Sequence, residues 1–219
     1  MVVFSVIYIL LLFAYFITRV GNNMKYRAVN KYILATMYMV YAIIMFLTRN
    51  LSVYHYVLMS ALVFAYLGDI FLVFDFSKGG TFFLSANICF FAFYLISLIK
   101  YSVSFWYCFW IFFVLVIIVG GFIALAQKFP NVLKLGSMKY PMSLYLASIT
   151  LHGLFGLVSA IFIGTTPIIV MGIGSILFMI SDYILIVDRF VFQKNKWIIR
   201  GNSLTYFTGL LLIVLSLGL

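Results

Sequence analysis

Residues 67–75 read LGDIFLVFD, and residues 180–188 read ISDYILIVD. Both stretches place a small residue before an aspartate, follow it with five apolar or aromatic residues, and end on a second aspartate. The chain has four acidic residues, and these two stretches hold all of them. A carboxylate inside an apolar helix is costly in hydrocarbon, and such residues usually mark a functional site. The two stretches therefore predict membrane helices that carry the chemistry of the protein.

The composition is that of an integral membrane protein. The chain is 67% hydrophobic and 8% charged, with a mean hydropathy of +1.24. Apolar runs that can cross about 30 Å of hydrocarbon recur along the whole sequence. We therefore predict an all-α membrane protein with one transmembrane domain over residues 1–219. Its eight expected membrane helices lie at residues 2–18, 32–48, 54–74, 82–99, 103–126, 142–163, 167–187 and 203–218.

The basic residues are distributed by loop, and this distribution predicts the orientation. Of the 14 lysines and arginines, all but Arg49 and Lys100 lie in or beside the odd-numbered loops. The positive-inside rule then places these loops in the cytoplasm and both termini outside. The net charge of +10 is thus explained by topology and by attraction to anionic headgroups. It does not indicate a nucleic-acid partner.

The two aspartate stretches also predict an internal repeat. Asp69 and Asp182 are 113 residues apart, and Asp75 and Asp188 have the same separation. An even number of helices lies between the stretches, so both cross the membrane in the same direction. We expect two parallel four-helix pseudo-repeats, at about residues 1–127 and 128–219, related by an axis along the membrane normal.

The outer and inner aspartates are expected to differ in role. Asp75 and Asp188 fall near the cytoplasmic helix ends, where a capping or topological role is expected. Asp69 and Asp182 lie six residues deeper, about 9 Å along a helix, and are the candidate functional residues.

Small residues beside the inner aspartates suggest how the two would meet. Gly68 precedes Asp69, and the seventh span carries Gly172, Gly174, Ser175 and Ser181. Such positions let membrane helices approach closely, so we expect the third and seventh spans to pack together. Two neighbouring buried acids would share one proton and provide a general acid and a general base.

Other polar residues within the spans give weaker signals. Asn87, Thr150, His152, Ser203 and Tyr206 are scattered through three helices. They form no metal-ligand cluster or phosphate-binding loop, so we expect no metal and no cofactor. The two cysteines, Cys89 and Cys108, fall inside spans and indicate no disulfide framework.

Four short motifs are spread over nearly the whole chain. They are Gly68-Asp69-x-x-Leu72, Pro141-x-x-x-Tyr145-x-x-x-Ile149, Ser181-Asp182-x-x-Leu185 and Ser203-x-x-Tyr206. In order and spacing they resemble the motifs of the lysoplasmalogenase, or YhhN-like, membrane proteins. The family usually shows His-x-x-Tyr in the fourth span. Here Phe91 stands in the histidine position before Tyr94, and Asn87 lies one turn earlier.

The resemblance implies hydrolysis of the vinyl ether bond of lysoplasmalogens to a fatty aldehyde and a glycerophospho-base. The substrate would be a membrane lysophospholipid, and no obligate protein partner is expected. Protonating an enol ether and activating water require an acid and a base, which Asp69 and Asp182 can supply. Which is the acid stays open. The residues expected to orient substrate or water are Asn87, Tyr94, Tyr145, His152, Ser181 and Tyr206. The residues expected at the cytoplasmic rim are Asp75, Lys78, Asp188, Arg189 and Arg200.

Two other functions fit the same pattern. A proton- or cation-coupled transporter could use the inner aspartates as carriers. A non-catalytic lipid-binding or assembly protein could use them to hold helices together. Replacing aspartate by asparagine distinguishes hydrolysis, altered ion flux and loss of folding.

Overall fold

The computed structural model describes residues 2–19, 24–49, 52–104, 106–133, 135–192 and 195–219. Within these residues the chain is helical and contains no strand. The eight α-helices are α1 (Val2–Thr18), α2 (Met24–Thr48), α3 (His55–Phe71), α4 (Phe76–Lys100), α5 (Trp106–Lys128), α6 (Lys139–Ile163), α7 (Thr166–Val187) and α8 (Lys196–Leu215). Short 3₁₀ turns precede α6 (Gly136–Met138) and follow α8 (Ser216–Gly218), and a π turn (Asp188–Phe192) extends α7.

Six of the eight helices are long and apolar enough to cross a membrane. The other two, α1 and α3, have 17 residues each, at the lower limit for a membrane span. The expected all-helical membrane architecture with eight helices is therefore present. The expected four-helix repeats and the side on which each terminus lies remain predictions.

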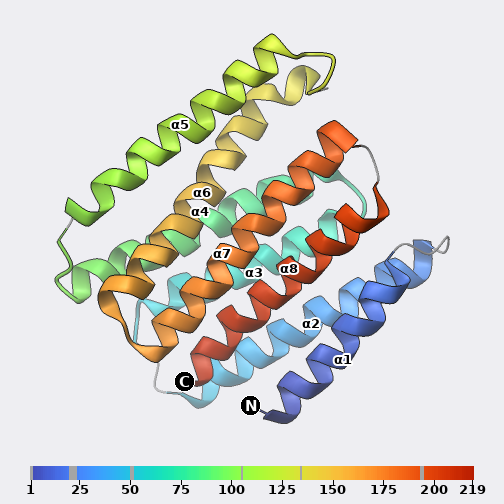
Figure 1. Ribbon diagram of the computed structural model, residues 1–219. Helices are drawn as coiled ribbons and strands as arrows, with labels where there is room; N and C mark the ends of the chain where they lie inside the picture. The colour runs from blue at the N-terminus through green and yellow to red at the C-terminus, as the bar shows by residue number, and fades with distance from the viewer. Residues whose placement is uncertain (1, 20–23, 50–51, 105, 134, 193–194) are drawn as a thin grey trace.

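The helices form one bundle in which α7 is central (Figure 1). Helix α7 packs between α6 and α8, and α3 packs along α4. Helices α1 and α2 lie at one edge and α5 at the opposite edge, where α5 contacts α6. Both termini lie at the same end of the bundle (Figure 1). This arrangement buries the polar residues of α3, α6, α7 and α8 and leaves α5 largely exposed.

Four helices begin earlier than the sequence predicts. Helices α2, α4, α6 and α8 start at residues 24, 76, 139 and 196 rather than at 32, 82, 142 and 203. The apolar run marks the part of a helix in hydrocarbon, but the backbone hydrogen bonds continue through the polar turns beyond it. Several basic residues assigned to loops, including Lys31, Lys78 and Arg200, therefore lie on helices. Lys134 and Lys194 fall outside the described residues, as does the side chain of Lys25.

Polar side chains fix the start of α4 and of α8. Asp75 has an extended backbone and accepts hydrogen bonds from the amides of Ser77 and Lys78, at 2.9 and 3.2 Å. Asn195 caps α8 in the same way. A capping oxygen satisfies amides that the helix itself leaves unpaired. Asp75 thus has the capping contacts expected of an outer aspartate.

The small residues of α7 pack against α6 and α8, and the expectation that they pack against α3 is wrong. A Cβ added at Gly174 would lie 2.6 Å from the Gly209 carbonyl oxygen in α8. One added at Gly172 would lie 2.6 Å from the Gly156 carbonyl oxygen in α6. These close approaches leave no room for side chains and set the spacing of three central helices.

Helix α3 is kept away from α7 by an aromatic ring of α4. A Cβ at Gly68 would lie 3.0 Å from the ring of Phe83. The absence of a side chain at Gly68 therefore makes room for this ring of α4. The Phe83 ring in turn makes edge contacts with Phe178 of α7, at 6.3 Å, and with Tyr206 of α8, at 5.8 Å. The inner aspartates must therefore meet across a space beside Phe83 and not at a helix–helix contact.

Candidate functional site

Asp69 and Asp182 line one small polar cavity, although their helices do not pack together. The cavity has a volume of about 40 Å³, enough for a few water molecules. Asp69 is fully buried and Asp182 is 3% exposed. The remaining lining residues come from α1, α2, α4, α7 and α8 and from the residues that follow α1 and α3. They include Arg19, Lys31, Phe83, Asn202, Ser203 and Tyr206.

Asp69 is surrounded by donors that suit an ionised carboxylate. The Lys31 ammonium lies 3.1 Å from its Oδ1. Tyr206 donates a hydrogen bond to Oδ2 at 2.8 Å, and Tyr38 donates to the same oxygen at 3.4 Å. A buried charge is tolerated when it is paired and hydrogen-bonded in this way.

Asp182 has a different environment. Within the described residues, its carboxyl group has one hydrogen-bond partner, the hydroxyl of Tyr145, which donates to Oδ2. No cationic side chain of the described residues lies within ion-pair distance of this carboxyl group. A protonated carboxyl group needs no counter-ion, so this environment suits the neutral acid.

The expectation of a proton-sharing pair stays a prediction. Within the described residues no hydrogen bond joins the two carboxyl groups, since Asp182 accepts from Tyr145 and Asp69 from Tyr206 and Tyr38. The Lys31 ammonium neutralises the charge of the Asp69 carboxylate, and the Tyr145 hydroxyl donates a hydrogen bond to the Asp182 carboxyl group. The structure therefore shows two unlike carboxyl groups facing one cavity.

A second polar cluster lies deeper in the bundle and does not line the cavity. His152 contacts Asn87 Oδ1 through Nδ1, at 3.1 Å, and Ser175 Oγ through Nε2, at 2.9 Å. Tyr94 shares a hydrogen bond of 2.7 Å with Ser175. The imidazole also stacks on Phe90, with centroids 4.4 Å apart. All these residues are buried, and the cluster joins α4, α6 and α7.

Asn87 is the incompletely bonded member of the deeper cluster. Its Oδ1 contacts His152, whereas its Nδ2 has no hydrogen-bond partner among the described residues.

Ser181 and the expected rim residues lie outside the cavity. Ser181 exchanges hydrogen bonds with Asn202 and so ties α7 to α8. Asp188 accepts from the amide of Asn195 at 3.1 Å. Arg200 stacks on Phe16 and Trp197, each 5.3 Å away. Lys78 is exposed on the first turn of α4.

Sequence reasoning missed the two cations of the cavity, Arg19 and Lys31. Both were assigned to a loop that sets topology. Arg19 follows α1 and donates from Nε to Ser203 Oγ at 3.0 Å. For Lys31 a signal was available, because residues 31, 34, 35, 38 and 42 share one face of α2. The last four of these are fully buried, which places Lys31 at the end of an inward-facing stripe.

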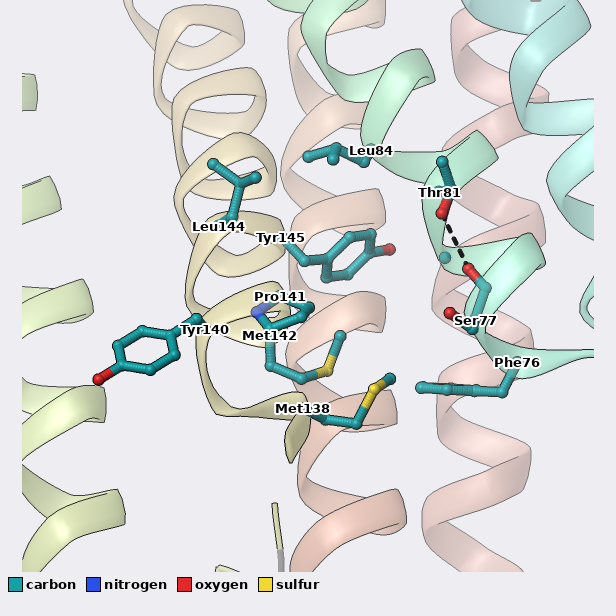
Figure 2. Close-up of a pocket in the computed structure, with 11 residues that line it drawn as sticks. Phe76, Ser77, Thr81, Leu84, Met138, Tyr140, Pro141, Met142, Leu144 and Tyr145 are labelled. Carbon is teal, nitrogen blue, oxygen red and sulfur yellow. Dashed lines mark hydrogen bonds between the residues drawn. The ribbon is translucent and has the colours of Figure 1, made fainter. Parts of the chain in front are cut away.

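An apolar groove between α4 and α6 ends beside the cavity. Its volume is about 510 Å³, within the range of small-molecule sites. Phe76 and Leu84 point from α4 toward α6, and Met142 and Tyr145 point from α6 toward α4 (Figure 2). Tyr145 therefore belongs to both places, because its ring lines the groove and its hydroxyl reaches Asp182.

Comparison with known proteins identifies the family. The model of the YhhN family matches residues 2–217, which is nearly the whole chain. The chain belongs to the YhhN family. The resemblance seen in the motifs is thereby confirmed for the family, and none of the curated proteins or solved structures matches the chain. In this YhhN protein, the aspartates of the two matching motifs are the carboxyl groups of the cavity.

The cavity provides what acid–base chemistry needs. One carboxyl group is set in surroundings that suit its protonated form, and the other is paired with a cation. Within the described residues, no group of three histidine, cysteine or acidic side chains is placed to hold a metal ion.

Proposed function

We propose that this YhhN protein hydrolyses the vinyl ether bond of a lysoplasmalogen, releasing a fatty aldehyde and a glycerophospho-base. One observation carries the proposal: two buried carboxyl groups with unlike partners face a single cavity of about 40 Å³. Family membership supports it. The reaction needs an acid, a base and a water molecule, and the cavity can hold all three.

Asp182 is assigned as the general acid. Its carboxyl group receives a hydrogen bond from Tyr145 and has no counter-ion among the described residues. It gives its proton to the double-bond carbon that is farther from the ether oxygen and carries the alkyl chain. The remaining cation is an oxocarbenium ion, in which the positive charge is shared by carbon and the ether oxygen.

Asp69 is assigned as the base. Its carboxylate is held in place by Lys31, Tyr206 and Tyr38. Such a preorganised negative group stabilises a developing positive charge without having to reorient. Water adds to the oxocarbenium carbon and gives a proton to Asp69, forming a hemiacetal.

Collapse of the hemiacetal restores the site. The carbon–oxygen bond to the glycerol breaks, and the leaving oxygen takes the proton from Asp69. The hemiacetal hydroxyl gives its proton to the carboxylate of Asp182 and becomes the aldehyde oxygen. Both aspartates return to their starting states, and one water molecule is consumed.

Aldehyde release from a lysoplasmalogen by the purified protein in detergent tests the proposal. We expect release by the wild type and a loss of at least about 100-fold in Asp69→Asn and in Asp182→Asn. Asp75→Asn is the matched control, because asparagine is also a good helix cap. It should fold and keep its activity.

The same variants distinguish the alternatives. If the folded wild type releases no aldehyde, and Asp182→Asn changes proton or cation flux in vesicles, the transporter is favoured. If both inner variants fail to fold while Asp75→Asn folds, the aspartates have a structural role. Absence of aldehyde release by the folded wild type rejects the hydrolase, and failure of the inner variants to fold rejects only the assignment of the two aspartates as acid and base.

A further inference from the structure

The groove between α4 and α6 adjoins the candidate site, because Tyr145 lines the groove and donates a hydrogen bond to Asp182. Its wall is mainly apolar and includes Phe76, Leu84 and Met142. The hydroxyl of Thr81 is already bonded to the carbonyl of Ser77, at 3.0 Å, and so adds little polarity. At its rim, Tyr140 and Leu144 are 72% and 60% exposed, so the groove opens to the outside of the bundle.

Three cationic residues neighbour lining residues at one end of this groove, because Lys78 follows Ser77, Lys139 stands between Met138 and Tyr140, and Arg189 contacts Phe76. Lys78 lies on the first turn of α4, and Lys139 is the first residue of α6. The guanidinium of Arg189 lies 4.9 Å from the centroid of the Phe76 ring, which lines the groove. The acidic neighbours are engaged elsewhere, because Asp75 caps α4 and Asp188 accepts from Asn195.

The depth of Asp182 matches this arrangement. It lies six residues, or about 9 Å, before Asp188, the residue that follows α7, and its carboxyl group accepts from Tyr145. A phosphate held among the three cations would sit at the mouth of the groove. The glycerol and the first carbons of the attached chain would then extend inward to Tyr145.

From these contacts we infer that the α4–α6 groove binds a single-chain phospholipid, with its phosphate near Lys78, Lys139 and Arg189 and its proximal chain against Tyr145. The inference rests on the proposed function for what happens next at Asp182. It adds the place where that ligand binds, its direction of entry from the lipid, and the role of the Tyr145 ring as the wall between groove and cavity.

Photo-crosslinking tests the binding without requiring hydrolysis. The probe is a 1-O-alkyl lysophospholipid that carries a diazirine near the glycerol and has a saturated ether, which the proposed reaction does not cleave. We expect labelled peptides from the first turns of α4 and α6, near Phe76–Leu84 and Met138–Tyr145. Excess unlabelled alkyl lysophospholipid should compete, and a diacyl phospholipid should compete poorly.

Two glycines provide a matched pair of variants. A Cβ added at Gly80, which lines the groove, or at Gly121, which lines an apolar crevice beside α5, meets no atom within 4 Å. Gly80→Leu fills the groove and should lower labelling about tenfold, because added bulk displaces the ligand. Gly121→Leu should leave labelling unchanged.

Labelling of the crevice lined by Ile118 and Tyr183, equal labelling of Gly80→Leu, or equal competition by diacyl lipid would overturn the inference. The wild-type labelling map gives a result even if Gly80→Leu does not fold. The experiments distinguish failure of the proposed hydrolysis from failure of the proposed lipid-binding groove. A labelled groove without hydrolysis rejects the enzyme and keeps the groove, whereas hydrolysis with an unlabelled groove rejects the groove alone.

Discussion

The ammonium of Lys31 lies 3.1 Å from Oδ1 of Asp69, and the two side chains are 12% and 1% exposed. Lys31 also donates to the backbone carbonyl of Asp69 at 3.1 Å. The pair joins α2 to α3 and places a compensated negative charge in the cavity. A buried ion pair costs more when one partner is removed than when both are replaced, which makes the pair open to a direct test.

Replacing Lys31 by methionine should destabilise the protein by about 3–5 kcal/mol, the usual cost of leaving a buried charge without its partner. Methionine keeps much of the length and apolar surface of the lysine stem. The measurement is the free energy of unfolding in detergent.

The double variant Lys31→Met/Asp69→Asn is the control. It removes both charges and should recover part of the lost stability, so that the two single effects do not add. Additive effects, or a loss below about 1 kcal/mol in Lys31→Met, would show that the pair is not important for stability.

Tyr145→Phe should lower hydrolysis about fivefold, because one hydrogen bond of about 1 kcal/mol positions Asp182. The ring that walls the groove is retained, so binding of the alkyl lysophospholipid should persist and the loss should appear in kcat and not in KM.

Tyr183→Phe is the matched control for Tyr145→Phe. The Tyr183 hydroxyl shares a hydrogen bond of 2.6 Å with Thr150 and lies away from the cavity. Its loss should leave kcat unchanged. Equal losses in both variants would indicate a general effect on packing.

Much of the fold could be predicted from the sequence, since hydrocarbon thickness sets the length of an apolar run. Helix ends were less predictable, because the turns beyond the membrane carry polar residues and look like loops. Lys31 shows the consequence. Its charge suggested a loop, whereas its place on the stripe with Leu34, Ala35 and Tyr38 puts it inside the bundle.

The aspartates of the site were evident from the sequence, but their partners were not. A glycine indicates close approach without saying to which helix, and Gly172 and Gly174 face α6 and α8. That choice depends on side chains distant in sequence, such as Phe83, which separates α3 from α7. The unlike environments of Asp69 and Asp182 follow from this packing.

His152 is expected to support stability more than catalysis. Both ring nitrogens have partners, and the ring stacks on Phe90. His152→Leu should cost about 1–3 kcal/mol, since Asn87 and Ser175 each lose a partner in a buried site.

Hydrolysis per folded molecule of His152→Leu should stay at the wild-type level, because the ring does not line the cavity. A large fall in kcat with unchanged stability would instead make His152 part of the reaction.

Gly174→Ala tests the contact between α7 and α8. The added methyl group would lie 2.6 Å from the Gly209 carbonyl oxygen, so the helices must separate. We expect a loss of about 1–3 kcal/mol and a lower unfolding temperature. Gly120→Ala, on α5, meets no atom within 4 Å and should unfold like the wild type. Equal unfolding temperatures for the two variants would mean that α7 and α8 are not in close contact.

The orientation predicted from the basic residues can be tested by labelling single cysteines in a variant without Cys89 and Cys108. Helices α4 and α6 begin at the same end of the bundle, since their first turns line one groove, and α7 begins at the other end. Lys78→Cys should therefore react with an impermeant maleimide from the cytoplasmic side, and Thr166→Cys from the opposite side. The reverse pattern would place the groove mouth outside the cell or in the lumen. The phospholipid would then have to come from the opposite leaflet, although the cations beside the groove would still face its headgroup.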